Sequence, residues 1–297
     1  KNPSLTVHLK ELDESSSEKA TQYGNMLEHT KLIDVVRSIK ICFDPDEHNS
    51  VMPGDKAVMA QYYEFEKLLD DCNGQETDDD IVKSKWVIRM EINPEILLEK
   101  NITMDDIHFA INSSNGNDIS CVYTDYNSSN LIFRIRINSS VLNKSKKQKG
   151  VAESLDQSDE IYLLRNFQES ILNNIVLRGI SGITNVLPRK LQNMVAKDND
   201  KFVQNDCWVL DTTGTNLMHI LAFDFIDNKR TYSNDIKEIF NVLGIEAARQ
   251  TLYNELTEVM DFSGVYINYH HLSILCDRMT SNHNLVAIFR SGILTDN

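Results

Sequence analysis

Two short segments alternate apolar and polar residues so regularly that they limit the folds open to this chain. The apolar positions are Trp86, Ile88, Met90 and Ile92 in the first segment and Leu131, Phe133, Ile135 and Ile137 in the second. Successive side chains of a β-strand point to opposite faces, so each segment predicts a strand with one face in a core. Residues 119–123 predict another strand. The chain must therefore supply helices that cover the apolar face of a sheet.

Helical spacing surrounds these strands. Val58, Tyr62, Phe65 and Leu69 recur at steps of four, three and four, and Asp55 stands where a helix cap is expected. A capping box formed by Thr103 and Asp106 predicts a second helix through Ile111, and a third spans about 159–176. We therefore predict a mixed α/β unit over residues 51–180.

The flanking segments have other patterns. Residues 4–9 predict a strand and residues 15–29 a polar helix, and a β-branched stretch ends at Asp44-Pro45-Asp46, where proline interrupts regular structure. After residue 180 we predict a strand at 208–211 and then helices. One begins at Asp235, with Glu238 completing a capping box, and others span about 246–262 and 270–280. The fold class predicted is α+β, with domains at 1–50, 51–180 and 181–297, the last mainly helical.

Charge and cysteine content exclude several classes of protein. With 30 Lys and Arg against 44 Asp and Glu, the net charge is −14, whereas a free-standing nucleic-acid binder is normally basic. The 5 cysteines are scattered and form no C-x-x-C pair, which argues against a disulfide framework and indicates a reducing compartment. No apolar run approaches the roughly 20 residues of a membrane-spanning helix.

Two groups of residues are potential metal ligands. Asp78-Asp79-Asp80, with Asp70 and Asp71 upstream, suits divalent cations, but consecutive carboxylates without glycine are more typical of a solvated loop. The other group has neither zinc-finger nor H-E-x-x-H spacing, so core or cap histidines are favoured. It consists of His270, His271, Cys276, Asp277 and His283.

Two further segments could approach phosphate groups. Thr212-Thr213-Gly214-Thr215-Asn216 is able to present backbone N–H groups, although a turn followed by a helix cap is the more common reading. The lysines of the 143–150 loop, which are Lys144, Lys146, Lys147 and Lys149, could contact a phosphate backbone or only increase solubility. No nucleophile, base and orienting group occur together, so we expect neither catalytic nor metal-binding residues in this chain.

Ordered sequence blocks carry a resemblance to a known family. In the C-terminal third they are Trp208-Val209-Leu210-Asp211-Thr212, Gly214-Thr215-Asn216-Leu217, Tyr232-Ser233-Asn234-Asp235, Val242-Leu243-Gly244-Ile245-Glu246-Ala247-Ala248-Arg249, Tyr266-Ile267-Asn268-Tyr269-His270-His271-Leu272, Asp277-Arg278-Met279-Thr280 and Arg290-Ser291-Gly292-Ile293. Near the N-terminus they are Lys1-Asn2-Pro3-Ser4-Leu5-Thr6-Val7, Leu27-Glu28-His29-Thr30 and Phe43-Asp44-Pro45-Asp46. In this order they resemble the largest subunit of eukaryotic-type RNA polymerases, RNA polymerase II in particular, directly after the trigger loop. The central region matches only in element order and in Trp86-Val87-Ile88-Arg89 and Leu177-Arg178-Gly179.

This resemblance implies a role in transcription. Residues 1–50 and 181–297 would belong to the cleft, and residues 51–180 would be the jaw that helps hold downstream DNA. The family's magnesium-binding motif, Asn-Ala-Asp-Phe-Asp-Gly-Asp, does not occur here, so the resemblance implies an enzyme subunit whose catalytic Mg²⁺ is held elsewhere in the subunit. The partners implied are the second-largest subunit, small accessory subunits, the DNA template and the downstream duplex, with no membrane.

Particular positions refine these expectations. Arg290 matches the arginine that begins a switch segment near the template, while Ser291 replaces the histidine that follows it in the family, so the DNA-contact candidates are Arg290 and the four lysines of the 143–150 loop. His270 stands where the family has arginine, which suggests a divergent lineage such as a large DNA virus or a fast-evolving protist. The expected location is the nucleus, or the virion or virus factory for a viral protein. Because residue 1 is not Met, we expect a segment of a longer chain or a processed one.

Two alternatives belong to other classes of protein. A non-enzymatic interaction module with a jaw-like fold would not associate with polymerase subunits in a pull-down. A free-standing metal hydrolase using Asp78–Asp80 would show activity as an isolated chain with a divalent ion.

Overall fold

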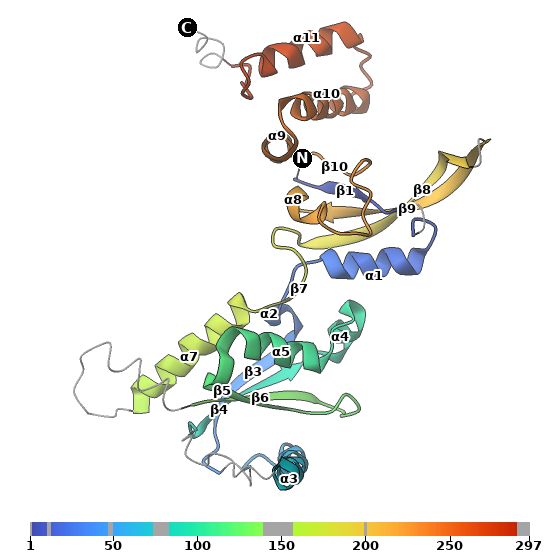
Figure 1. Ribbon diagram of the computed structural model, residues 1–297. Coiled ribbons are helices and arrows are strands. Elements are labelled where there is room, and N and C mark those ends of the chain that lie inside the picture. The colour runs from blue at the N-terminus through green and yellow to red at the C-terminus, as the bar shows by residue number, and fades with distance from the viewer. Residues whose placement is uncertain are drawn as a thin grey trace. The chain divides into compact units, whose positions relative to one another are not determined.

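The chain folds into helices and antiparallel sheets, the α+β class predicted (Figure 1). The computed structural model describes residues 2–10, 13–46, 50–73, 83–138, 157–198 and 201–289. Two compact units are present: unit 1 comprises residues 1–29 and 178–297, and unit 2 comprises residues 30–177. Unit 2 therefore interrupts the sequence of unit 1.

The centre of unit 2 is a sheet of four antiparallel strands in the order β3-β4-β6-β5. Their bounds are β3 Val36–Phe43, β4 Trp86–Ile92, β5 Ile119–Tyr123 and β6 Leu131–Ile137. Ile88 pairs with Ile135 and Met90 with Phe133, so the predicted apolar positions lie on one face, as the alternation requires. The predicted strands are confirmed.

Helices cover this apolar face and complete the core of unit 2. They are α2 Leu32–Val35, α4 Pro94–Lys100, α5 Met104–Asn115 and α7 Gln157–Asn174. Thr103 caps α5 through the predicted capping box with Asp106, and the buried Ile107, Ile111 and Leu164 pack into the core. The 18-residue helix α3, Lys56–Asn73, lies on the other side of the sheet (Figure 1). A 3₁₀ turn, Gly116–Asp118, precedes β5.

Unit 1 contains a second antiparallel sheet, in the order β10-β1-β9-β8. Its strands are β1 Leu5–His8, β8 Asn185–Asp198, β9 Lys201–Thr213 and β10 Tyr232–Ser233. The helix α1, Ser17–Leu27, is capped by Ser16 and packs on β8 and β9. Strand β8 was not predicted. Its Pro188 argues against a central strand, but β8 is the edge strand, where a missing N–H donor is tolerated.

The remaining elements of unit 1 are helices, as expected for the end of the chain. They are α8 Leu217–Ile220, α9 Ile236–Leu243, α10 Ile245–Phe262 and α11 Tyr269–Thr280. Asp235 caps α9 through its side chain. The predicted capping box does not form, because the Glu238 carboxylate accepts hydrogen bonds from the Leu217 N–H and the Ser233 hydroxyl. In the part of the chain that is described, no helix is long and apolar enough to cross a membrane.

The chain crosses between the units at residues 29/30 and 177/178. There β2, Thr30–Lys31, pairs with β7, Val176–Arg178. We expected the first boundary near residue 50, but β3 pairs along its length with β4 and so lies in unit 2. A proline near the end of a strand marks the end of an element and need not mark the end of a domain.

Candidate functional site

The second face of the unit 2 sheet carries a row of positive charges. Arg89 on β4 lies directly opposite Arg134 on β6 and, on its other side, opposite Lys40 on β3. Like charges directly opposite each other destabilise a sheet, and Arg134 is only 4% exposed. Buried cations of this kind require carboxylate partners.

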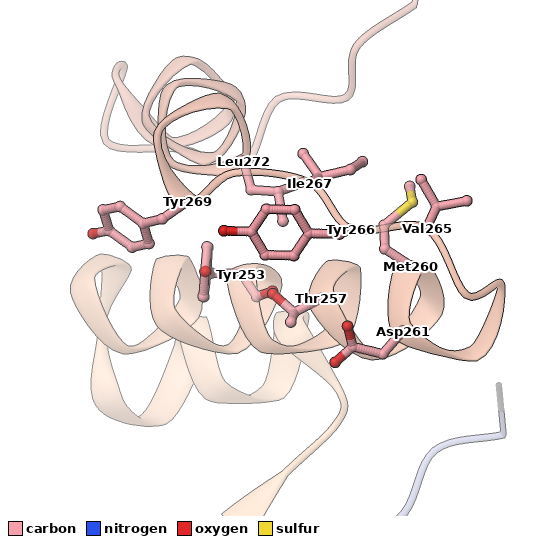
Figure 2. Close-up of a pocket in the computed structure, with 9 residues that line it drawn as sticks. All are labelled: Tyr253, Thr257, Met260, Asp261, Val265, Tyr266, Ile267, Tyr269 and Leu272. Atoms are coloured by element: carbon pink, nitrogen blue, oxygen red, sulfur yellow. The ribbon is translucent and has the colours of Figure 1, made fainter.

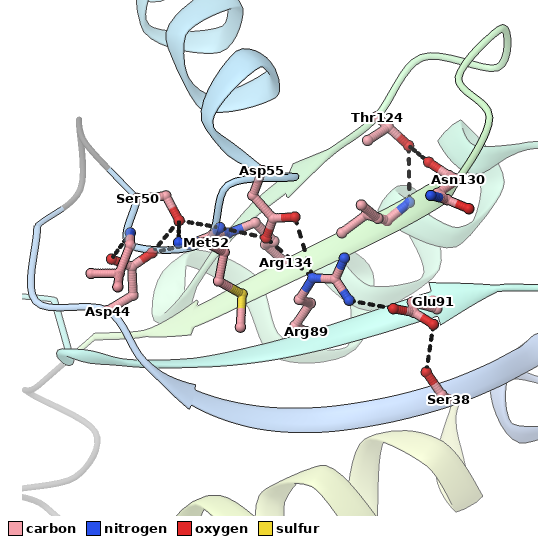
Figure 3. A network of polar contacts seen from close by, with 12 residues as sticks. Ser38, Asp44, Ser50, Met52, Asp55, Arg89, Glu91, Thr124, Asn130 and Arg134 are labelled. Carbon is pink, nitrogen blue, oxygen red and sulfur yellow. Dashed lines mark hydrogen bonds and ion pairs between the residues drawn. The ribbon is translucent and has the colours of Figure 1, made fainter.

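Two buried aspartates provide these partners, as Figure 3 shows. Arg134 donates from Nη2 to Oδ2 of Asp44 at 2.6 Å and from Nη1 to Oδ2 of Asp55 at 2.7 Å. Arg89 donates from Nε to the same oxygen of Asp55 at 3.2 Å and also pairs with Glu91. Asp55 therefore lies between the two opposed guanidinium groups, and Asp55, Asp44 and Glu91 together compensate their charge.

Ser50 completes this arrangement, which we call the Arg134 network and which comprises Asp44, Ser50, Asp55, Arg89 and Arg134. The Ser50 hydroxyl donates to Asp44 at 2.7 Å and accepts from Arg134 at 3.0 Å. The network ties the residues before α3 to the middle of the sheet. Because Arg89 and Arg134 are held by carboxylates, their role here is to stabilise unit 2.

The Arg134 network predicts acid sensitivity. Burial raises the pKa of Asp44, but the hydrogen bonds from Ser50, Arg134 and the Val51 N–H lower it by more than burial raises it. The pKa of Asp44 therefore lies below its ordinary value of 3.8. A carboxyl with a depressed folded pKa contributes stability that is present above the unfolded pKa and is lost as the pH falls through the folded pKa. We expect the urea concentration at the midpoint of unfolding to decrease once the pH is lowered below about 4, and to decrease less steeply with pH in Asp44→Asn. Equal slopes in the two proteins would contradict this assignment.

A cavity of about 200 Å³ lies between α10 and α11 in unit 1 (Figure 2). One wall is α10, and the other is the connection 263–268 with the start of α11. Gly264, with φ of +70°, turns the chain after α10, and Asn268 caps α11. The lining residues are Tyr253, Thr257, Met260, Asp261, Val265, Tyr266, Ile267, Tyr269 and Leu272.

Two residues that line this cavity are well exposed: Tyr266 is 89% exposed and Val265 51%. The exposed Val259, Phe262 and Ile274 are not among the lining residues, because helical periodicity places them on the opposite faces of α10 and α11. Single exposed apolar residues of this kind are common on protein surfaces.

Most of the sequence-predicted site residues lie outside the described part of the chain. The DNA-contact candidates Arg290, Lys144, Lys146, Lys147 and Lys149, and the carboxylates Asp78–Asp80, lie outside the described residues. Asp70 and Asp71 belong to α3, but their side chains also lie outside the described part. The proposed DNA contacts therefore stay predictions.

The histidine cluster does not come together. His270, His271 and His283 are exposed, which contradicts a core position, and the N-cap of α11 is Asn268, while Asp277 pairs with Arg249. Within the described residues no group of three His, Cys, Asp or Glu side chains is placed to hold a metal ion. His270 and His271 lie in the first turn of α11, and His283 follows the end of that helix.

The segment 212–216 forms a turn followed by a cap. The Gly214 N–H donates to the Pro3 carbonyl at 2.9 Å, and the Asn216 side chain accepts from the His219 N–H. A backbone N–H that is already bonded is not available to a phosphate. The turn reading is therefore the one that fits.

Sequence reasoning missed both features described above. The Arg134 network had one signal, since arginines at positions 134 and 136 alternate with apolar residues inside a strand that is buried on both faces. The cavity had no comparable signal, because its lining depends on how α10 and α11 pack.

Comparison with known families gives one match over the whole chain. A family model described as RNA polymerase Rpb1, domain 5, matches residues 1–297.

Proposed function

Because the chain belongs to the RNA polymerase Rpb1 domain 5 family, we propose that it serves as a jaw and cleft element that helps to hold downstream DNA. It is thus part of the largest subunit of a DNA-directed RNA polymerase. Membership implies assembly with other polymerase subunits and with DNA. In the proposal unit 2 is the jaw and unit 1 the cleft.

One observation carries this assignment. Unit 2 is a compact α/β unit, with its own sheet and core, inserted between two parts of unit 1. A jaw that projects from a cleft requires such an insertion, because it must be rigid in itself and connected to its base by few chain crossings. The sheet of unit 2 is held on both faces, by a helical layer on one and by the Arg134 network on the other.

The chemistry is proposed to come from outside this chain. Template-directed RNA synthesis uses metal ions that activate the attacking hydroxyl and stabilise the leaving oxygen, and we place that Mg²⁺ in another part of the same subunit. The protein's location then follows that of its polymerase, in the nucleus, or in the virion or virus factory if the source is a large DNA virus.

DNA holding is tested through the salt dependence of template binding by the complete polymerase. Each phosphate contact that is removed lowers the slope of log K against log salt concentration by about 1. We expect Arg290→Ala to weaken template binding and to flatten this slope, and replacement of the four lysines of the 143–150 loop to do the same for downstream duplex.

Arg189→Ala is the matched control. Arg189 is also an exposed arginine, but its guanidinium pairs with Asp211 on the neighbouring strand. We expect this variant to keep the wild-type slope. Unchanged slopes for both Arg290→Ala and the lysine variant would contradict the DNA-holding role.

A further inference from the structure

Helix α3 adds little apolar contact to unit 2. Of its side chains that the structure describes, only Met59 is buried, whereas Phe65 is 61% exposed and Leu68 64%. The described core of unit 2 includes no residue of α3. On the opposite face of the sheet, α5 buries Ile107 and Ile111 completely. Because a helix in a protein is stabilised mainly by the burial of its apolar face, α3 is held less firmly than α5.

The start of α3 is attached to the sheet by charged groups. The Asp55 carbonyl accepts a hydrogen bond from the Met59 N–H at 3.0 Å, so the helix begins directly after Asp55. The Asp55 carboxylate is directed at the sheet, where it accepts from Arg89 and Arg134 (Figure 3). Ser50, which also precedes α3, accepts from Arg134 at 3.0 Å. The Arg134 network is therefore the principal described link between the start of α3 and the sheet.

A buried ion pair holds two elements together less firmly than buried apolar surface does. Both partners lose hydration on burial, and their attraction largely offsets this loss, so the net contribution of the pair to stability is small. If residues 50–73 leave the sheet together, the carboxylates and guanidinium groups all regain water. No charge is then left buried without a partner, as it would be after a point mutation. Separation of this segment therefore requires less free energy than disruption of the apolar core.

We propose that residues 50–73, which we call the α3 strap, open from the sheet as one element while the core of unit 2 stays folded. The Arg134 network holds the strap closed. Opening brings Arg89 and Arg134 to the surface beside Lys40, which lies directly opposite Arg89 on β3. Segments with few buried apolar contacts commonly open in this way, at a lower free energy than global unfolding. The inference does not depend on the jaw and cleft role.

Hydrogen–deuterium exchange of the complete polymerase, followed by mass spectrometry, tests the α3 strap. Peptides from Lys56–Asn73 report on α3 and peptides from Met104–Asn115 report on α5. We expect the α3 amides to exchange at least about 100-fold faster than the α5 amides, each relative to its rate in an unfolded peptide, because α5 exchanges only when the core opens. Equal protection of the two helices would overturn the proposal.

Ile107→Val distinguishes opening of the strap from opening of the whole unit. Ile107 is fully buried in the core, and the loss of one methylene group there destabilises the core moderately. We expect α5 to exchange about fivefold faster in this variant and α3 to exchange at the wild-type rate, because the core remains intact when the strap opens. Equal acceleration of both helices would show that α3 opens only together with the core, which contradicts the proposal.

Asp55→Asn tests whether the Arg134 network holds the strap closed. The substitution keeps the shape of the side chain and removes the charge between Arg89 and Arg134, so we expect α3 to exchange at least about tenfold faster. Glu64→Gln is the matched control, because it removes an exposed negative charge from α3 itself, and it should leave the exchange of α3 unchanged. Wild-type exchange of α3 in Asp55→Asn would refute the assigned role of the network, and with it the strap.

Discussion

Replacing Arg134 by methionine is expected to lower the free energy of unfolding by about 3–5 kcal/mol. The change leaves Asp44 and Asp55, each 1% exposed, as buried carboxylates without their main cation. Removing one partner of a buried ion pair costs far more than the pair itself contributes, because the remaining charge is neither paired nor hydrated. Urea denaturation of wild-type and variant chains, followed by circular dichroism, measures the difference.

Arg165→Met controls for the loss of an arginine as such. Arg165 pairs with Glu169 on the surface of α7, with side chains 68% and 61% exposed, and we expect a change within about 0.5 kcal/mol. Adding Asp44→Asn and Asp55→Asn to Arg134→Met should restore part of the lost stability, since the uncompensated charges are then gone. A loss below about 1 kcal/mol in Arg134→Met would show that the network is not the source of stability that we infer.

Gly214→Ala is expected to be strongly disruptive in unit 1. Gly214 has φ of +94°, and a Cβ there would stand 1.9 Å from the Gly182 carbonyl oxygen. The obstacle is backbone on a closely packed turn, so it cannot move aside as a side chain would. Left-handed strain and overpacking together give a loss on the order of 4 kcal/mol. Urea denaturation with fluorescence of Trp208, which lies on β9 of the same unit, reports this change.

Two other glycines separate the causes. Gly244 has the same φ of +94° but no atom within 4 Å of its Cβ position, so Gly244→Ala should cost only the backbone strain, about 1–3 kcal/mol. Gly54 has neither the conformation nor a close neighbour, and Gly54→Ala should be nearly neutral. If Gly214→Ala costs no more than Gly244→Ala, the collision with Gly182 is not the cause.

Local patterns predicted most elements because their causes lie within a few residues. The alternation at 86–92 and 131–137 fixed which side chains share a sheet face, and Thr103 with Asp106 fixed the start of α5. Strand β8 could not be predicted in this way. Its place depends on pairing with β9, and only the position of β8 at the sheet edge makes Pro188 acceptable.

The sites were harder to predict than the elements. The Arg134 network joins residues separated by 79 and 90 positions, and no short window of sequence contains both charges. The α10–α11 cavity depends on the path of the connection 263–268. The family resemblance, by contrast, was carried by ordered blocks near both ends of the chain, and the family match over residues 1–297 confirms it at the level of the largest polymerase subunit.

The pairing of β2 with β7 has a consequence for how such a protein can change over evolution. Neighbouring strands are about 4.8 Å apart, so the chain leaves unit 1 and returns to it at nearly the same point. An inserted unit whose two ends lie side by side can be changed as a whole. Its interior can be lengthened, trimmed or exchanged while the host sheet keeps its register, and this part of the gene is free to diversify faster than the sequence on either side.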